Sequence, residues 1–222
     1  MLEAASRAST CGNMQLYSLI VTQSRELREA LAPCHFNQPM VTQAPCVITV
    51  CADVHRFSMW CEQRDAEPCY DNFAWFLNGV TDALLAAQNL CVEAEAHGLG
   101  ICYLGTTIYT AEEIARILDL PKGVIPVTTI VVGHPDESPE LTDRLPLDAV
   151  VHCEKYHHYT SSEIDELWAE KETSEETRRL LEENGLPNLA QIFTRNRYRA
   201  EDNLAISRNY FALLKKQGFF NN

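Results

Sequence analysis

The longest regular pattern of apolar residues lies between Asp71 and His97. Apolar side chains recur there at alternating steps of four and three, a period that predicts one amphipathic helix. The stripe consists of Phe73, Leu77, Val80, Leu84, Ala87, Cys91 and Ala94, widened by Phe76, Ala83 and Leu90. Asp71 or Asn72 can cap its start, and Gly98 can take the left-handed conformation just past its end. We expect this helix to be buried as the backbone of the fold.

Shorter apolar runs predict strands. Residues 16–22, 101–104 and 127–132 are rich in β-branched or aromatic side chains and are bounded by polar residues, Gly or Pro. The run 46–53 is apolar on both faces, which is typical of a strand covered on both sides. We therefore expect it to be central in a sheet.

Local signals predict further helices in the first half of the chain. Residues 2–8 are good helix formers and look like the last turns of a longer helix. Ser24 can cap a helix through about Leu31. Thr110 and Glu113 have the spacing of a capping box, which opens a helix through about Leu118.

The second half of the chain is more polar. Residues 135–147 are rich in proline and acid, and they predict a loop. Residues 161–183 predict a charged helix, and residues 203–217 predict an amphipathic helix that Gly218 ends.

The charge balance narrows the range of functions. The formal net charge is −13, which repels a phosphate backbone or an anionic bilayer over most of the surface.

The nine cysteines form no CxxC pair, and several lie inside apolar runs, as is usual in a reducing compartment. With no apolar stretch of membrane-spanning length and no signal peptide pattern, we expect a cytoplasmic protein.

The glycine-rich segment 98–105 invites comparison with a dinucleotide-binding motif. In that motif the glycines follow a strand and open a helix, whereas here they follow a helix and precede a strand. Two interpretations stay open. The segment either caps a helix and forms a tight turn, or brings the backbone of Gly105 and Thr106 close to a ligand.

Other polar residues can be interpreted either as ordinary structural or surface residues or as functional ones. His157 and His158 are neighbours and point apart in regular structure, so surface histidines are favoured over a metal site. Cys61 and Cys69 could act as thiol nucleophiles near His55, but no third orienting group is evident. Arg144 lies on a stiff, proline-bounded loop, where its guanidinium can hold a phosphate.

Taken in order along the chain, several motifs resemble the nitroreductase family, most closely its oxygen-insensitive NADPH nitroreductase and flavin reductase branch. The resemblance covers residues 2–160, and it is carried by Ala8–Gln15, Ala86–Leu90, Gly98–Gly105, Gly133–Pro135, Arg144–Leu147 and Val150–His152 with Tyr156. It implies an α+β fold with a mostly antiparallel sheet wrapped by helices, in an intertwined homodimer. Residues 1–160 would form the core, and residues 161–222 a helical extension that packs on the partner subunit.

The resemblance also implies FMN at the dimer interface. Ser9, Thr10 and Asn13 would approach the flavin, in the same or the opposite subunit. Gln38 would bond its polar edge, and Arg144 would hold its phosphate. The ring would be lined by Tyr103, Leu104, Gly105 and Thr106, with a backbone N–H near Thr106 facing flavin N5.

The implied activity is that of an oxidoreductase with NADPH or NADH as co-substrate. It would reduce nitroaromatics, quinones or flavins by ping-pong hydride transfer through flavin N5, and no side chain would be catalytic. Two alternatives stay open: a non-catalytic homodimeric flavin-binding or structural protein, and a thiol-dependent enzyme that uses Cys61 or Cys69.

Two positions depart from the family pattern. The usual Arg-x-Ser-x-Arg segment that grips the FMN phosphate and ribityl groups would stand before residue 1. The basic residue usually found two positions before the loop arginine is here Thr142. Arg144 is therefore the strongest phosphate contact that these 222 residues predict.

Overall fold

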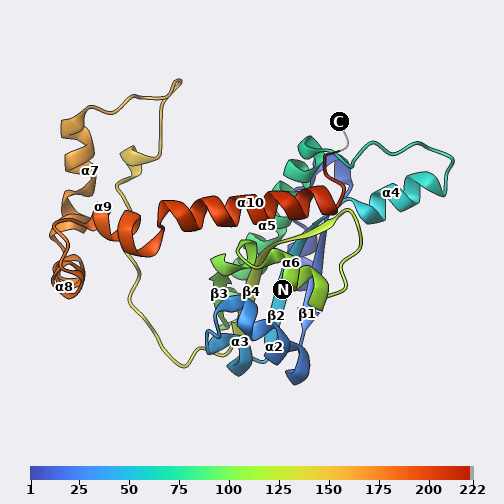
Figure 1. Cartoon of the computed structure of the whole chain (residues 1–222), viewed down its shortest axis with the longest axis horizontal. Coiled ribbons are helices and arrows are strands. Elements are labelled where there is room, and N and C mark those ends of the chain that lie inside the picture. Colours follow the sequence, from blue (N-terminus) through green and yellow to red (C-terminus); the bar gives the residue numbers. More distant parts are fainter. Residues whose placement is uncertain (221–222) are drawn as a thin grey trace. The chain divides into compact units, whose positions relative to one another are not determined.

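A computed structural model describes residues 1–220 (Figure 1). The chain forms two compact units, one built from Met1–Glu137 with the chain from Ile206 onward, the other from Ser138–Ala205. These limits differ from the division expected at residue 160, because the last part of the chain belongs to the first unit. The packing of residues 161–222 on a partner stays a prediction.

The first unit contains one antiparallel sheet of four strands, which confirms the predicted α+β class (Figure 1). The strands are β1 (Tyr17–Thr22), β2 (Cys46–Asp53), β3 (Gly100–Leu104) and β4 (Val124–Gly133), in the order β1-β2-β4-β3. β2 is central, as its two apolar faces predicted, and all but its first residue are buried.

β4 begins three residues before its predicted start. Its partner register shifts between Val50 and Cys51, which pair with Thr128 and Pro126 and leave Val127 as an extra residue. This bulge lets a central strand hold Pro126, which cannot donate a ladder hydrogen bond. The Tyr210 hydroxyl donates to the Pro126 carbonyl at 3.1 Å. In the sequence, Pro126 suggests the end of a strand. In the structure, the bulge between β2 and β4 accommodates it inside β4.

The long helix is α5 (Phe73–Ala96), close to its predicted limits. The Asn72 side chain accepts from the Trp75 N–H at 3.3 Å, and Gly98 has a φ of 71°, so both predicted end signals are confirmed. Small residues of α5 face the sheet. A Cβ on Gly79 would lie 3.1 Å from the Ala52 Cβ and 3.3 Å from the Leu16 carbonyl oxygen. Glycine therefore permits the close approach of α5 to β2.

The apolar stripe predicted on α5 is buried in part: Ala87, Cys91 and Ala94 are buried with Phe76, Ala83 and Leu90, whereas Phe73, Leu77 and Leu84 are exposed in the single chain. Leu77 and Leu84 are 48% and 42% exposed, and Phe73, Leu85 and Val92 are exposed as well. The buried face is instead rich in alanine: Ala83, Ala86, Ala87, Leu90 and Ala94 pack on the sheet. Small side chains bring the helix backbone close to the strands, and Leu77 and Leu84 are left on the outer face.

Short helices cover the opposite face of the sheet (Figure 1). They are α2 (Arg25–Leu31), the 3₁₀ turn η2 (Ala32–His35) and α3 (Met40–Gln43). Ser24 caps α2 by accepting from the Leu27 N–H at 3.2 Å, as predicted. At the start of the chain, α1 (Leu2–Ser6) packs against α5 through the buried Ala5.

The predicted capping box at Thr110 is wrong, although the helix α6 (Ala111–Ile117) is present. The Thr110 hydroxyl donates to the Cys34 carbonyl at 2.7 Å, so it is oriented by η2 rather than by its own helix. The Glu113 carboxylate pairs with Arg116 at 2.5 Å instead of reaching back to residue 110.

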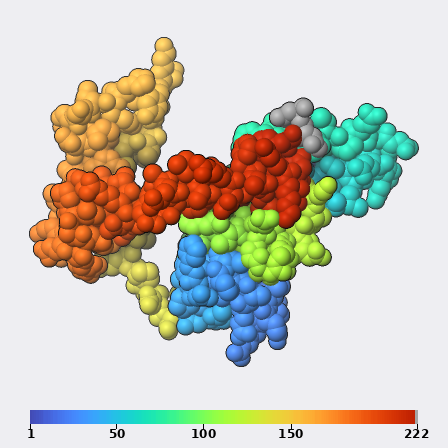
Figure 2. Space-filling view, viewed as in Figure 1, coloured from blue at the N-terminus to red at the C-terminus, as the bar shows by residue number. Residues whose placement is uncertain are grey.

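Helix α4 (His55–Glu62) and the loop after it were not predicted. Figure 2 shows this segment in cyan as a lobe of the first unit. A chain of aromatic contacts attaches it to α5: Phe57 lies 5.2 Å from Tyr70, and Tyr70 lies 4.7 Å from Trp75, both edge to face.

The second unit is mainly helical. It holds η4 (Leu147–Ala149), α7 (Ser161–Thr173), α8 (Glu175–Asn184), α9 (Leu189–Ile192), η5 (Phe193–Arg197) and the start of α10 (Ala200–Lys216). The single helix predicted over 161–183 is wrong, because Ser174 leaves the helical conformation and caps α8 by accepting from the Thr177 N–H. The loop predicted over 135–147 is confirmed over 135–146, and Leu147 begins η4. Within residues 1–220, no helix has the length and apolar content needed to cross a membrane.

Candidate functional site

The loop with Ser9, Thr10 and Asn13 is held on α5 by one carboxylate. Asp82 is 2% exposed and accepts three hydrogen bonds, from the Thr10 hydroxyl at 2.5 Å, the Cys11 N–H at 2.9 Å and the Leu16 N–H at 3.1 Å. The same hydroxyl accepts from the Gln15 N–H at 2.9 Å. The Thr10 side chain is therefore engaged inside its own loop, and Ser9 and Asn13 are exposed.

Sequence reasoning missed Asp82. The signal that could have found it is its position: it lies three residues after Gly79 and four before Ala86, on the face of α5 that packs inward. An acid at a buried position needs hydrogen-bond donors, and here the loop supplies them.

The segment of the chain with Gln38 makes a tight turn after η2. Phe36 and Asn37 both have a φ of 55°, so two successive non-glycine residues are left-handed. The Gln38 N–H donates to the His35 carbonyl at 3.1 Å, while its side chain is half-buried and makes no hydrogen bond within residues 1–220. The amide of Gln38 is therefore available to a ligand.

Tyr103 and Leu104 lie on opposite faces of β3. The Leu104 side chain is 2% exposed and packs with Val47 and Val131, so only its backbone can meet a ligand. Tyr103 lies on the α5 side, where its hydroxyl contacts the Cys91 thiol; burial raises the pKa of Tyr103. The tyrosine hydroxyl therefore stays protonated at neutral pH.

Gly105 and Thr106 begin the turn η3 (Gly105–Ile108) directly after β3. A Cβ built on Gly105 would meet no atom within 4 Å, so the backbone there faces open space. The Thr106 hydroxyl lies 2.8 Å from His35 Nδ1, and the Thr107 hydroxyl donates to the Leu104 carbonyl at 2.9 Å. The turn is thus exposed at Gly105 and is held on its buried side by the hydrogen bonds of Thr106 and Thr107.

His35 is a second residue that sequence reasoning missed. It is fully buried, and burial lowers its pKa to about 4, so the imidazole is neutral at physiological pH. Its Nε2 has no hydrogen-bond partner within the described residues. A histidine in the apolar segment before the Gln38 turn was the available signal.

Arg144 belongs to the second unit, and within the described part of the chain its side chain bonds only Thr142 and Asp143. One nitrogen, Nη1, donates to the Thr142 hydroxyl at 2.6 Å and to the Asp143 carbonyl at 2.9 Å. Nε and Nη2 make no hydrogen bond within residues 1–220. Thr142, the position that departs from the family pattern, therefore orients the arginine and leaves two of its nitrogens available.

The structure brings some of the predicted contacts together. His35 connects the Gln38 turn to Thr106, so these two groups share one support. No hydrogen bond joins the Ser9–Asn13 loop to η3 within the described chain. Beside that loop is a hollow of about 240 Å³, lined by Ser9, Thr10, Cys11, Asn78, Thr81, Asp82 and Leu85.

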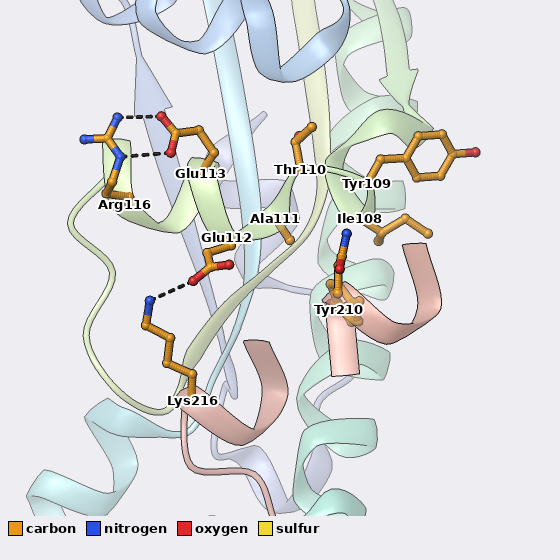
Figure 3. A pocket seen from close by; sticks show the side chains of 10 residues that line it. Ile108, Tyr109, Thr110, Ala111, Glu112, Glu113, Arg116, Tyr210 and Lys216 are labelled. Carbon is orange, nitrogen blue, oxygen red and sulfur yellow. Dashed lines mark hydrogen bonds and ion pairs between the residues drawn. The ribbon is translucent and has the colours of Figure 1, made fainter. Parts of the chain in front are cut away.

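A larger cavity of about 480 Å³ lies between η3, α6 and the end of α10 (Figure 3). Lys216 pairs with Glu112 at 2.8 Å, and Arg116 pairs with Glu113. Because carboxylates neutralise both cations, the cavity offers no unpaired charge to a phosphate. None of the predicted FMN contacts lines it.

The thiol and metal interpretations gain no support from geometry. Cys61 is buried and contacts Tyr70, while Cys69 is exposed. No histidine bonds either thiol within residues 1–220. His157 pairs with Glu163 at 3.0 Å, and the described residues contain no group of His, Cys, Asp and Glu side chains suited to a metal ion.

Comparison with known proteins identifies the class of protein that this fold and site define. The nitroreductase family matches over residues 1–134. A solved structure from Bacteroides fragilis NCTC 9343, described as an oxidoreductase, has a TM-score of 0.97 and 50% identity, and covers 99% of this chain and 89% of that chain. The NfrA1 nitroreductase of Bacillus subtilis has a TM-score of 0.84 and 26% identity, with 100% and 89% coverage.

Curated relatives agree with this assignment. An FMN reductase (NADPH) of Bacillus subtilis strain 168 is 33% identical over 159 residues, which are 71% of this chain and 64% of the relative. An NADPH-dependent oxidoreductase of Staphylococcus aureus strain USA300 is 35% identical over 161 residues, with the same shares. The chain belongs to the nitroreductase family, as its motifs predicted. It matches less than two thirds of the length of these curated relatives.

Proposed function

We propose that the chain is an FMN-dependent NAD(P)H oxidoreductase that reduces small electrophiles such as nitroaromatics, quinones or free flavins. The names of its relatives support this: one is an NADPH-dependent FMN reductase and another an NADPH-dependent oxidoreductase. The observation that carries the proposal is the open space over Gly105, where a planar ring can approach the backbone.

The residues present fit FMN. The first N–H groups of a helical turn have no acceptor within that turn, so those of Gly105 and Thr106 can donate to the ring. Gln38 has an uncommitted amide for the polar edge, and Ser9 and Asn13 are exposed on the loop that Asp82 supports. Arg144 has two uncommitted nitrogens for the phosphate. The chemistry supplied by bound FMN is the uptake and release of a hydride.

The protein's own contribution is to bind, orient and exclude water. Binding nucleotide and acceptor in turn at one face would place each against the same ring atoms. A backbone N–H near Thr106 is the expected donor to N5, where charge develops on reduction. No side chain is required as an acid or base, which agrees with the neutral state of His35 and Tyr103.

Flavin titration and a turnover screen test the proposal. The protein should bind FMN stoichiometrically and become yellow, and it should then oxidise NADPH or NADH when supplied with nitroaromatics, quinones or flavins. Failure of both flavin binding and nucleotide oxidation would remove the proposal. Flavin binding without turnover would favour the non-catalytic alternative.

We propose in addition that the outer face of α5 forms a homodimer interface. Five large apolar residues are exposed on this helix: Phe73, Leu77, Leu84, Leu85 and Val92. Sedimentation should show a dimer at micromolar concentration. Burying a leucine contributes about 1.5 to 3 kcal/mol, and a symmetric dimer buries Leu84 of both subunits, so this contribution enters the dimer's stability twice. Leu84→Glu should therefore weaken the dimer at least about 100-fold.

A matched control for that variant is Val21→Glu, which places the same charge at an apolar residue on β1 that is 40% exposed. It should leave the dimer intact. A wild-type protein that sediments only as a monomer would contradict both the interface and a flavin site shared between subunits.

The cysteines should be dispensable to turnover. If flavin carries the electrons, the double variant Cys61→Ser and Cys69→Ser should keep steady-state rates within about twofold of wild type, because neither thiol is positioned by a histidine. Steady-state assays with FMN content measured in parallel test this. Loss of activity with flavin still bound would favour the thiol-dependent alternative.

A further inference from the structure

The segments η2 and η3 are joined by side-chain hydrogen bonds at both ends of η3. At its start, the Thr106 hydroxyl bonds His35 Nδ1 at 2.8 Å. Beyond its end, the Thr110 hydroxyl donates to the Cys34 carbonyl at 2.7 Å. Between them, Thr107 bonds Thr129 of β4 at 3.0 Å. Only the first of these bonds is made by the turn residue next to the open backbone of Gly105.

His35 contributes a hydrogen bond to Thr106 that an apolar residue in its place could not make. It is fully buried with Nε2 unpaired, and leaving a buried polar atom without a partner opposes folding. The chain then needs two left-handed residues, Phe36 and Asn37, to turn back toward the surface at Gln38. Within residues 1–220, the hydrogen bond to Thr106 is the one polar contact that the ring makes.

The unpaired nitrogen also favours one tautomer. A buried N–H without an acceptor is rarer in proteins than a bare acceptor nitrogen, so the ring proton belongs on Nδ1. Nδ1–H then donates to the Thr106 oxygen. The hydroxyl hydrogen of Thr106 is left to point away from His35, and no acceptor for it exists within residues 1–220.

We propose that His35 is a positioning residue for the flavin site: its Nδ1–H holds Thr106, fixes the Gly105–Thr106 backbone and directs the Thr106 hydroxyl outward as a donor to the flavin ring. The inference rests on the proposed function. It adds a side-chain donor and its buried support to a site otherwise built from backbone. The imidazole of His35 is neutral under physiological conditions because burial lowers its pKa.

A matched set of variants tests it. His35→Phe keeps a planar ring and removes both nitrogens, whereas His35→Asn keeps a donor near the position of Nδ1. Thr106→Val removes the acceptor. Thr42→Val removes a threonine hydroxyl near the Gln38 turn that bonds the Pro39 carbonyl at 3.2 Å and makes no hydrogen bond to η3 within residues 1–220, and it serves as the control.

The first measurement is amide hydrogen exchange in the apoprotein, which needs no flavin. Loss of one hydrogen bond should speed exchange at Gly105, Thr106 and Thr107 about 2- to 10-fold in His35→Phe and Thr106→Val. His35→Asn should restore most of the protection, and Thr42→Val should leave these three amides within about twofold of wild type. Unchanged exchange in His35→Phe would overturn the positioning role.

The second measurement is flavin affinity together with the visible spectrum of the bound flavin. His35→Phe should weaken FMN and riboflavin equally, by about 2- to 10-fold, because the ring rather than the phosphate loses its donor. It should add nothing in the Thr106→Val background. Equal losses in both backgrounds would overturn the inference. If wild type binds neither flavin, the proposed function fails, and the exchange data still decide whether His35 positions Thr106.

Discussion

Replacing Arg144 with alanine should raise the FMN dissociation constant about 10- to 150-fold. A charge-assisted hydrogen bond contributes about 1.5 to 3 kcal/mol, and this factor is its equivalent in affinity. The residue two positions earlier is Thr142, which is neutral and bonds only Nη1. Nε and Nη2 remain for a phosphate. Titrating FMN and riboflavin into the wild-type and variant apoproteins measures the effect.

Riboflavin is the internal control, because it lacks the phosphate. It should lose little affinity, and the melting temperature of the apo variant should stay near that of wild type while most of the FMN-induced rise disappears. Arg179→Ala, which removes an exposed arginine paired with Glu183 on α8, should leave both flavins unaffected. If FMN and riboflavin weaken equally, Arg144 is a structural loop residue and the phosphate lies elsewhere.

Replacing Asp82 with alanine should lower the free energy of unfolding by about 3 to 5 kcal/mol. The change leaves the Thr10 hydroxyl and the N–H groups of Cys11 and Leu16 without their acceptor. An unpaired buried donor such as the Leu16 N–H costs about 1 to 3 kcal/mol, the partly buried Thr10 and Cys11 donors cost less, and removal of a buried negative charge offsets part of that sum. Denaturant unfolding of the apoprotein, followed by tryptophan fluorescence, measures the difference.

Two further variants make this prediction specific. Glu95→Gln changes an exposed acid on the same helix and should stay within about 0.5 kcal/mol of wild type. Thr10→Val should cost much less when combined with Asp82→Ala than it does alone, because the two residues share one hydrogen bond. A loss below about 1 kcal/mol for Asp82→Ala would show that the loop is held by other contacts.

The sequence by itself determined the elements whose signals are local. The apolar period placed α5, and Asn72 and Gly98 marked its ends, because a cap depends only on residues within a turn of it. The two apolar faces of residues 46–53 identified β2 as a central strand, since such a strand must be covered on both sides. The ordered motifs also identified the family.

The tertiary structure decided every feature that depends on a partner distant in sequence. How closely Gly79 and the alanines let α5 approach β2 decided which part of the predicted stripe packs inward, so Leu77 and Leu84 lie on the outer face of the single chain. Thr110 failed as a cap because its hydroxyl is turned toward the carbonyl of Cys34, 76 residues away, to which it donates, and it accepts no N–H of its own helix. Asp82 and His35 find their partners across 72 and 71 residues. Such hydrogen bonds form only after the chain has folded back on itself, so a local pattern can mark Asp82 and His35 as polar residues at buried positions but cannot identify their partners.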